Sequence, residues 1–180
     1  MINVVASRYA EALFQIGEEE NLVDLLYSEL KAVVGIFDEN QEFFNIIKSP
    51  VISKKEKIEL IDKVFSKGIN PNSINFLKLL IEKNRISFIA DIAMSYKERL
   101  NEKNNVIEGT VITAIPMNQD EIQELAKELS KKYNKNVTLE NIVDKSILGG
   151  VLVRLGNEEI DGTVKTRLSK VKEQLSQVIS

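Results

Sequence analysis

The sequence contains no histidine, no cysteine and no tryptophan among its 180 residues. Without imidazole and thiol groups it has no Ser-His-Asp or Cys-His nucleophile, and it lacks the usual ligands for zinc, iron–sulfur clusters and haem. An enzyme of this composition would have to rely on carboxylates, lysine, arginine or hydroxyl groups. The absence of cysteine is compatible with a reducing cytosol, and a chain of this length buries an adequate core without disulfides.

A large net charge and long apolar runs are also missing. The 24 Lys and Arg residues nearly balance the 27 Asp and Glu residues, and the isoelectric point is near 5.3. Because nucleic-acid-binding proteins need a basic surface, we expect no nucleic-acid partner. The longest apolar run, residues 147–153, is far shorter than the roughly 20 residues that span a bilayer. We therefore expect no membrane insertion, and the N-terminus shows no signal-peptide pattern.

Proline is scarce, with three residues in the whole chain, so long stretches are free to be helical. Apolar residues recur every three to four positions through the first 100 residues, which is the period of an amphipathic helix. Ser53 and Glu56 have the spacing of a capping box, and Asn70-Pro71 is a helix start. The pattern predicts six helices, at about 3–17, about 21–38, a short one ending at 48, 53–68, one starting at 70–71, and one carrying apolar residues from 89 to 100.

The pattern changes after residue 105. Residues 106–115 are rich in β-branched side chains, and residues 137–142 alternate between apolar and polar, so both are expected to be strands. Two shorter strands, 150–155 and 158–161, flank a two-residue turn at Gly156-Asn157. Helices are predicted from about Asn118 and from about Thr163. The predicted fold class is α+β, with an all-α six-helix bundle at about 1–104 and a smaller α+β domain at about 106–180.

Few residue groups suggest chemistry. Leu148-Gly149-Gly150 could cradle a phosphate, but no Gly-Lys-Ser/Thr follows and a strand comes next, so a bulge or tight strand start is the simpler interpretation. Glu82 and Arg85 lie three residues apart on a predicted helix, a spacing more typical of a surface ion pair than of a catalytic acid. We predict no catalytic residue, no metal ligand and no cofactor.

Two predicted helices carry more apolar surface than one buried face requires. In the first helix, Val5, Tyr9, Ala12 and Ile16 form one stripe, and Ala6, Ala10 and Leu13 form another. In the fifth helix, Ile74, Leu77 and Ile81 form a stripe that Phe76, Leu79 and Leu80 widen. The pattern alone favours central helices that are covered nearly all round. The alternative is that the spare stripes form an exposed groove for an amphipathic helix of a partner.

The last predicted helix poses a similar choice. Its apolar residues, Val164, Leu168, Val171, Leu175 and Val178, are spaced 4, 3, 4 and 3. This stripe could pack on the helix's own sheet or form a coiled-coil contact with another chain. Packing on the sheet is favoured, because a stable coiled coil needs more heptads than this helix has.

Three segments of the chain resemble the delta-subunit family of F-type ATP synthase, to which the mitochondrial oligomycin sensitivity-conferring protein belongs. The first is Arg8-Tyr9-Ala10-Glu11-Ala12-Leu13-Phe14, and the second runs from Asn75-Phe76-Leu77 to Glu82-Lys83-Asn84-Arg85. The third is the stretch 137–168, which resembles the family's signature region. Its matching positions include Asp144, Gly149, Gly150, Gly156, Asp161 and Gly162. The resemblance covers essentially the whole chain.

The resemblance implies a non-catalytic stator subunit that links the alpha/beta catalytic head to the b-type peripheral stalk, so that ion-driven rotation is coupled to ATP synthesis. It implies that the N-terminal helix of an alpha subunit binds between the first and fifth helices, at Tyr9, Ala12, Asn75 and Leu79. Val5 joins this set from the apolar stripe. It further implies that the C-terminal domain contacts the b subunits, for which the candidates are Leu168, Val171, Leu175 and Val178.

The implied location is the cytoplasmic face of a bacterial cell membrane, where the complex holds the subunit peripherally. Two other classes of function were weighed against this one. A generic two-domain adaptor that binds an amphipathic helix is compatible with the composition. A small enzyme based on carboxylates or lysine is disfavoured, because the chain has no clustered acidic residues and no glycine-rich cradle.

Overall fold

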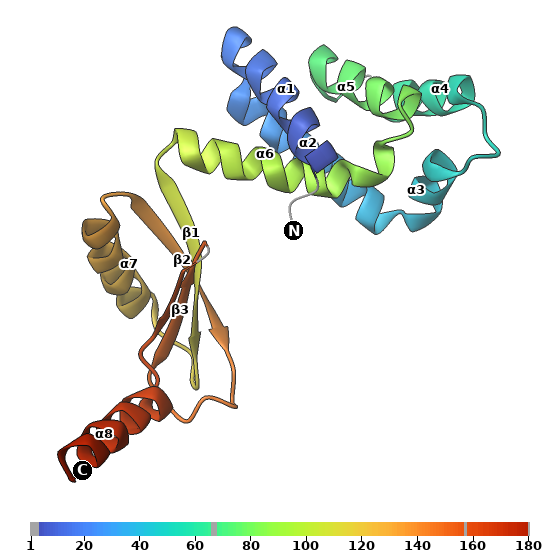
Figure 1. Cartoon of the computed structure of the whole chain (residues 1–180). Helices are drawn as coiled ribbons and strands as arrows, with labels where there is room; N and C mark the ends of the chain where they lie inside the picture. The colour runs from blue at the N-terminus through green and yellow to red at the C-terminus, as the bar shows by residue number, and fades with distance from the viewer. Residues whose placement is uncertain (1–3, 66–67, 157, 180) are drawn as a thin grey trace. The chain divides into compact units, whose positions relative to one another are not determined.

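The computed structural model describes residues 4–65, 68–156 and 158–179, with side chains up to residue 172 (Figure 1). Contacts divide the chain into two units, Met1–Leu100 and Asn101–Ser180. The sequence pattern placed the boundary four or five residues later, where helix periodicity gives way to strand composition. The sixth helix runs across the division, since it continues to Lys103.

The first unit is all helical, and the second combines helices with a sheet, so the predicted α+β fold class is confirmed. The helices of the first unit are α1 (Val4–Glu20), α2 (Val23–Glu39), α3 (Gln41–Lys48), α4 (Lys54–Phe65), α5 (Pro71–Glu82) and α6 (Ile89–Lys103), with a short 3₁₀ helix η1 (Ile86–Phe88). These are the six helices that the apolar period predicts. The fourth helix is described as far as Phe65, residues 66 and 67 lie outside the described residues, and Gly68 lies in a turn.

Polar side chains fix where α4 and α5 begin. Ser53 and Glu56 form the predicted reciprocal bonds, since each backbone N–H donates to the side chain of the other. Asn70 accepts a bond from the Asn72 N–H and caps α5. The Glu29 carboxylate of α2 accepts bonds from the Asn70 N–H and the Ser73 hydroxyl, at 2.8 and 2.5 Å. The start of α5 is therefore tied to α2.

The core of the first unit forms one continuous apolar cluster that all six helices share. Tyr96 of α6 lies fully buried at its centre, and its hydroxyl donates to the Val23 carbonyl at 3.0 Å. Burial raises the pKa of the Tyr96 hydroxyl far above its ordinary value, with smaller contributions from Asp24 and Glu18. The hydroxyl therefore remains a hydrogen-bond donor throughout the physiological pH range.

The second unit has a four-stranded sheet of order β2-β1-β3-β4, with β1 and β2 parallel and the other pairs antiparallel. The strands are β1 (Val106–Thr113), β2 (Asn136–Val143), β3 (Val151–Leu155) and β4 (Glu158–Asp161), and the helices are α7 (Gln119–Tyr133) and α8 (Val164–Ile179). Helix α7 connects the two parallel strands, as such a connection requires. Its Leu129 packs with Val111, Val137, Val153 and Leu155 in the core of this unit.

Two glycines of the signature region lie where the chain of the second unit changes direction. Gly150 has a φ of 81° and directly precedes β3, so the prediction of a tight strand start is confirmed. A Cβ atom at Gly150 would lie 2.5 Å from the Gly162 carbonyl oxygen and 2.9 Å from the Thr163 Cα. Gly156, with a φ of 56°, follows β3 in the predicted hairpin connection. Asn157 of that turn lies outside the described residues.

Two carboxylates of the signature region cap local turns. Asp144 accepts a bond from the Ser146 N–H, which lowers the pKa of its carboxyl. Asp161 accepts bonds from the Thr166 hydroxyl at 2.7 Å and the Thr163 N–H at 2.8 Å, just before α8. These bonds, the one from Thr166 first, lower the pKa of the Asp161 carboxyl. Both acids therefore act as structural acceptors in the turns.

Candidate functional site

The first unit carries an apolar hollow between α1 and α5. Its volume is about 440 Å³, and its lining residues are Val5, Arg8, Tyr9, Ala12, Leu13, Ile16, Phe76, Leu79 and Arg85. Four of the five predicted partner-binding residues line it, namely Val5, Tyr9, Ala12 and Leu79. The fifth, Asn75, is exposed on α5 one helical turn before Leu79 and is not among the lining residues.

The two stripes of α1 have different environments, which explains the hollow. Ala6, Ala10 and Leu13 are buried against the bundle, whereas Ala12 is exposed and Ile16 keeps 39% of its surface exposed. The small side chains at 6 and 10 let α1 lie close to its neighbours, and its second stripe is left facing outward. The interpretation that α1 is covered nearly all round is therefore wrong.

Helix α5 differs from α1, because most of its apolar surface is buried. Phe76, Leu77, Leu80 and Ile81 belong to the core, and Leu79 alone of the large apolar side chains of α5 is exposed, at 39%. The large apolar side chains of α5 are therefore mostly buried, although the helix also has an exposed side at Asn75 and Leu79. Helix α5 contributes two residues to the lining of the hollow, the projecting Leu79 and the buried Phe76.

Contacts between helices hold the walls of the hollow in place. The rings of Tyr9 and Phe76 meet edge to face, with centroids 6.3 Å apart, and so join α1 to α5. Lys78 of α5 pairs with Asp62 of α4 at 2.7 Å. These contacts, together with the bonds that Asn70 and Ser73 donate to Glu29, hold the walls of the hollow in a preformed shape.

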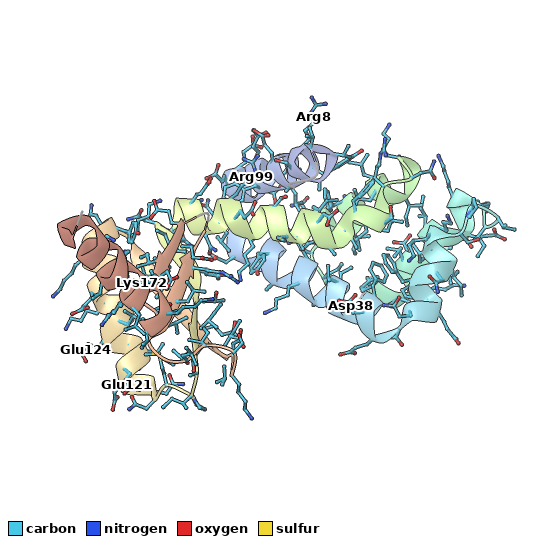
Figure 2. All side chains as sticks on the ribbon, turned by 60° about the horizontal axis from the view of Figure 1, so that its bottom comes forward. Arg8, Asp38, Arg99, Glu121, Glu124 and Lys172 are labelled. Atoms are coloured by element: carbon cyan, nitrogen blue, oxygen red, sulfur yellow. The ribbon has the colours of Figure 1, made fainter. Side chains whose placement is uncertain are left out.

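Two arginines give the apolar hollow a positive border. Arg8 belongs to α1, and Figure 2 shows it extending outward from that helix. Arg85 follows the end of α5, with its guanidinium 5.8 Å from the centre of the Phe88 ring. The sequence interpretation of Arg85 as the ion-pair partner of Glu82 is wrong, because α5 ends at Glu82 and Asn84 turns the chain with a φ of 54°. Among the described residues, no ion pair joins the two.

The structure also corrects the prediction for the last helix. Val164, Leu168 and Val171 of α8 are 40%, 62% and 52% exposed, so this part of the stripe does not pack on the helix's own sheet. Leu175 and Val178 belong to the same helix, but their side chains lie outside the described residues. The described part of α8 therefore presents an exposed apolar face.

In the parts of the chain that the structure describes, no group of three or more acidic, histidine or cysteine side chains could hold a metal ion. The hollow between α1 and α5 has apolar walls, two arginines and no carboxylate among its lining residues. None of the described helices is both long and apolar enough to cross a membrane.

Comparisons with known proteins identify the family. The family model described as "ATP synthase delta (OSCP) subunit" matches residues 5–175. The ATP synthase subunit delta of Clostridioides difficile (strain 630) is 60% identical over 181 residues, covering 100% of both chains. That of Alkaliphilus metalliredigens (strain QYMF) is 39% identical over 179 residues, covering 99% of both.

Solved structures support the same fold. A chain of the Toxoplasma gondii mitochondrial ATP synthase hexamer aligns with a TM-score of 0.71 at 22% identity, over 96% of this chain and 98% of that one. The match of the family model and the full-length similarity to the curated delta subunits are the decisive findings. The chain belongs to the ATP synthase delta (OSCP) subunit family, the peripheral-stalk components that link to the catalytic head of F-type ATP synthase.

Proposed function

We propose that this chain is a non-catalytic linker whose two units bind different partners within the synthase. The N-terminal unit binds the N-terminal helix of an alpha subunit of the catalytic head, and the C-terminal unit binds the b-type peripheral stalk. The complex holds the chain peripherally at the cytoplasmic face of the cell membrane. The observation that carries the proposal is the preformed apolar hollow between α1 and α5.

The hollow has the shape and chemistry that suit an amphipathic helix. Ala12 has a small side chain, so a partner helix can approach the α1 backbone closely, while Ile16 and Leu79 offer apolar side chains on either side. Burying apolar area contributes about 25 cal/mol per Å², which permits tight binding by a short segment. Arg8 and Arg85 favour a partner helix with acidic residues on the flanks of its apolar face.

The exposed face of α8 is the corresponding candidate on the second unit. Leu168 and Val171 lie about one turn apart, with more than half of each side chain exposed. An apolar face of this kind on a helix pairs readily with another helix. The b subunits of the stalk are the proposed partner, and Leu175 and Val178 continue the same stripe.

A stator needs strong attachment at both ends and no turnover chemistry. The rotating shaft applies torque to the head, and work is extracted only if the head cannot follow the rotation. Two separate binding surfaces on two separately packed units meet this requirement. Such a protein needs no nucleophile and no metal ligand, so the absence of histidine and cysteine is compatible with this function.

Calorimetric titration of the full chain with a synthetic alpha-subunit N-terminal peptide from the same organism tests the head contact. We expect Ala12→Asp to weaken binding at least ~30-fold, because it places a carboxylate in an apolar contact. Ala32→Asp is the matched control, since Ala32 is exposed within α2 and lies outside the hollow. Equal affinities for the two variants would rule out the hollow as the binding site.

A second pair of variants separates binding from folding. Leu79→Ala should weaken peptide binding by about 5- to 30-fold, because it removes a projecting apolar side chain. Leu25→Ala is its control, as Leu25 of α2 has a similar exposed fraction of 43% and does not line the hollow. Both variants should keep the thermal stability of the wild type. A large loss of stability for Leu79→Ala alone would show that Leu79 serves the core.

The stalk contact is tested in the same way with a peptide from the C-terminal end of the b subunit. Leu168→Ser should reduce binding at least ~10-fold. Ile115→Ser serves as control, because Ile115 is an exposed apolar residue of the same unit that lies outside α8. An undiminished affinity of Leu168→Ser would remove α8 from the proposed interface.

A further inference from the structure

The first turn of α5 is capped by a side chain from another helix. In α4 and α7, the third helical residue is a glutamate whose carboxylate accepts a bond from the N–H of its own N-cap residue, Ser53 or Asn118. In α5 the third helical residue is Ser73, and the N–H of the N-cap residue Asn70 donates instead to the Glu29 carboxylate of α2, at 2.8 Å. Helix α5 therefore depends on α2 for a cap that α4 and α7 supply themselves.

Glu29 holds this turn at two points. The buried Ser73 hydroxyl donates to the second oxygen of the same carboxylate, at 2.5 Å. The negative charge also lies at the N-terminus of α5, where the helix dipole favours it. The Asn72 amide donates to the Glu20 carboxylate of α1 at 2.6 Å, but that contact is exposed to solvent. The half-buried Glu29 is therefore the stronger anchor, because its bonds are better shielded from water.

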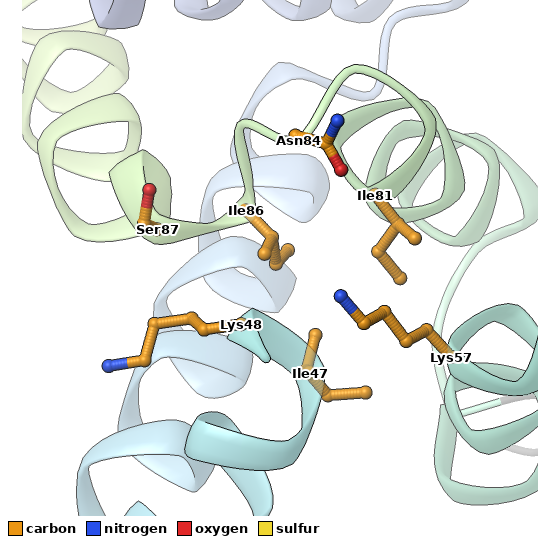
Figure 3. Close-up of a pocket in the computed structure, with 7 residues that line it drawn as sticks. All are labelled: Ile47, Lys48, Lys57, Ile81, Asn84, Ile86 and Ser87. Carbon is orange, nitrogen blue, oxygen red and sulfur yellow. The ribbon is translucent and has the colours of Figure 1, made fainter. Parts of the chain in front are cut away.

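The opposite end of α5 is packed less completely. Figure 3 shows a small cavity beside its last turn, with a volume of about 60 Å³ and a lining that includes Ile47, Lys57, Ile81 and Ile86. Side chains that face a cavity have fewer packing partners, which leaves this end of the helix room to shift. Two contacts with α4, from Lys54 to the Glu82 carbonyl and between Lys78 and Asp62, are exposed to solvent, and such contacts contribute little. Leu79 projects into the hollow from this part of α5, so its position depends on the anchor at the start of the helix.

We propose that Glu29 is a positioning residue for partner binding. It belongs to α2 and is not among the residues that line the hollow between α1 and α5. By fixing the first turn of α5, its carboxylate holds Leu79 at the distance from α1 that an incoming helix fits. A preformed site needs no rearrangement during binding, which raises the affinity without adding a contact. The inference rests on the proposed binding of an alpha-subunit helix, and it adds a remote residue that decides how tightly that helix is held.

Calorimetric titration of the full chain with the alpha-subunit N-terminal peptide tests this role. We expect Glu29→Ala to weaken binding about 5- to 20-fold, because the hollow is then no longer held in its binding shape. Glu29→Gln should bind within about 3-fold of the wild type, since its amide can accept from the Asn70 N–H and donate to the Ser73 hydroxyl. Glu11→Ala is the matched control and should leave the affinity unchanged. Glu11 of α1 also joins two helices, through Arg99 of α6, but it does not line the hollow.

A double-mutant cycle separates positioning from a general loss of stability. In the Leu79→Ala background no projecting side chain remains to be positioned, so Glu29→Ala should weaken binding there by less than about 2-fold. A loss of the same size in both backgrounds would overturn the proposal. If Glu29→Ala does not fold, Ser73→Ala takes its place in the cycle, because it removes one of the two bonds and should weaken binding only where Leu79 is present.

The outcome for the wild type distinguishes this inference from the proposed function. If the wild type binds the peptide and Glu29→Ala binds it equally well, the positioning role of Glu29 is wrong and the head contact stands. If the wild type does not bind the peptide, the proposed head contact and the role of Glu29 both fail.

Discussion

At the residue scale, one buried tyrosine of the first unit combines a hydrogen bond with aromatic packing. Tyr96 illustrates this, because its ring contacts both Phe14 and Tyr27 while its hydroxyl reaches the backbone of α2. Gly17 lies against the same hydroxyl, and a Cβ atom there would be 2.9 Å from its oxygen. One hydroxyl group thus sets how closely α1, α2 and α6 approach one another.

We predict that Tyr96→Phe lowers the free energy of unfolding by about 1 kcal/mol, because it removes the bond to the Val23 carbonyl and leaves the ring in place. Chemical denaturation of the full chain measures this change. Tyr27→Phe is the control, since the Tyr27 ring stacks on that of Tyr96 but no bond of its hydroxyl is seen among the described residues. Equal losses for the two variants would show that the buried bond contributes nothing.

Asp161 gives a pH-dependent prediction at the same scale. Its pKa is lowered from the ordinary value of 3.8 by the bonds from Thr166 and Thr163. An acid whose pKa is lower in the folded state stabilises that state above its unfolded-state pKa and loses this contribution as the pH falls through the folded-state value. The start of α8 should therefore remain intact down to about pH 4 and loosen below it.

Amide NMR of Thr163 and Thr166 between pH 6 and pH 2 follows this loosening. We expect a titration midpoint below 3.8 in the wild type and no such transition in Asp161→Asn, which carries no ionisable group at the turn. A wild-type midpoint at or above the ordinary value would mean that the two threonine bonds do not act on the carboxylate.

At the element scale, two glycines differ in whether their surroundings leave room for a Cβ atom. Gly109 lies in the central strand β1, where a Cβ atom would meet the Leu155 side chain and come within 2.6 Å of the Arg154 carbonyl oxygen. Gly35 lies within α2, with no atom of another segment within 4 Å of such a Cβ. Close packing requires the first glycine, whereas nothing in the described surroundings requires the second.

We predict opposite effects of alanine at these two positions. Gly35→Ala should stabilise the first unit by about 0.5–1 kcal/mol, because alanine loses less backbone freedom in a helix than glycine does. Gly109→Ala should destabilise the second unit by about 1–3 kcal/mol through overpacking against β3. Thermal unfolding of each variant measures both effects. A destabilising effect of alanine at 35 would show that helix propensity does not decide the outcome at this position.

At the scale of the whole molecule, the two units have separate cores. One core comprises residues of α1 to α6, and the other comprises residues of β1 to β3 and α7. A chain with two independent cores need not unfold in one step.

Scanning calorimetry of the full chain should therefore show two unfolding transitions. Tyr96→Phe should lower the midpoint of one transition and Gly109→Ala that of the other, because each variant alters a different core. A single transition that both variants shift equally would show that the two units fold as one.

Much of the fold could be predicted from the sequence, because its signals are local. The capping residues Ser53 and Asn70, the apolar periods of the helices and the change to β-branched residues at Val106 all act within a few positions of the chain. The candidate hollow was predicted in part, since Val5, Tyr9, Ala12 and Leu79 line it. The interpretation of Arg85 as an ion-pair partner of Glu82 was wrong, because α5 ends at Glu82 and the left-handed turn at Asn84 redirects the chain before Arg85.

The sequence by itself determined the succession of elements and the family, because periodicity, caps and motifs are properties of neighbouring residues. Only the tertiary structure decided which apolar stripes remain exposed, since a stripe is buried or exposed according to segments far away in the chain. Packing against the bundle buried Ala6 and Ala10 and left Ala12 and Ile16 facing outward. The same packing enclosed Lys57 among residues of three other segments, and no local pattern distinguishes that lysine from its exposed neighbours.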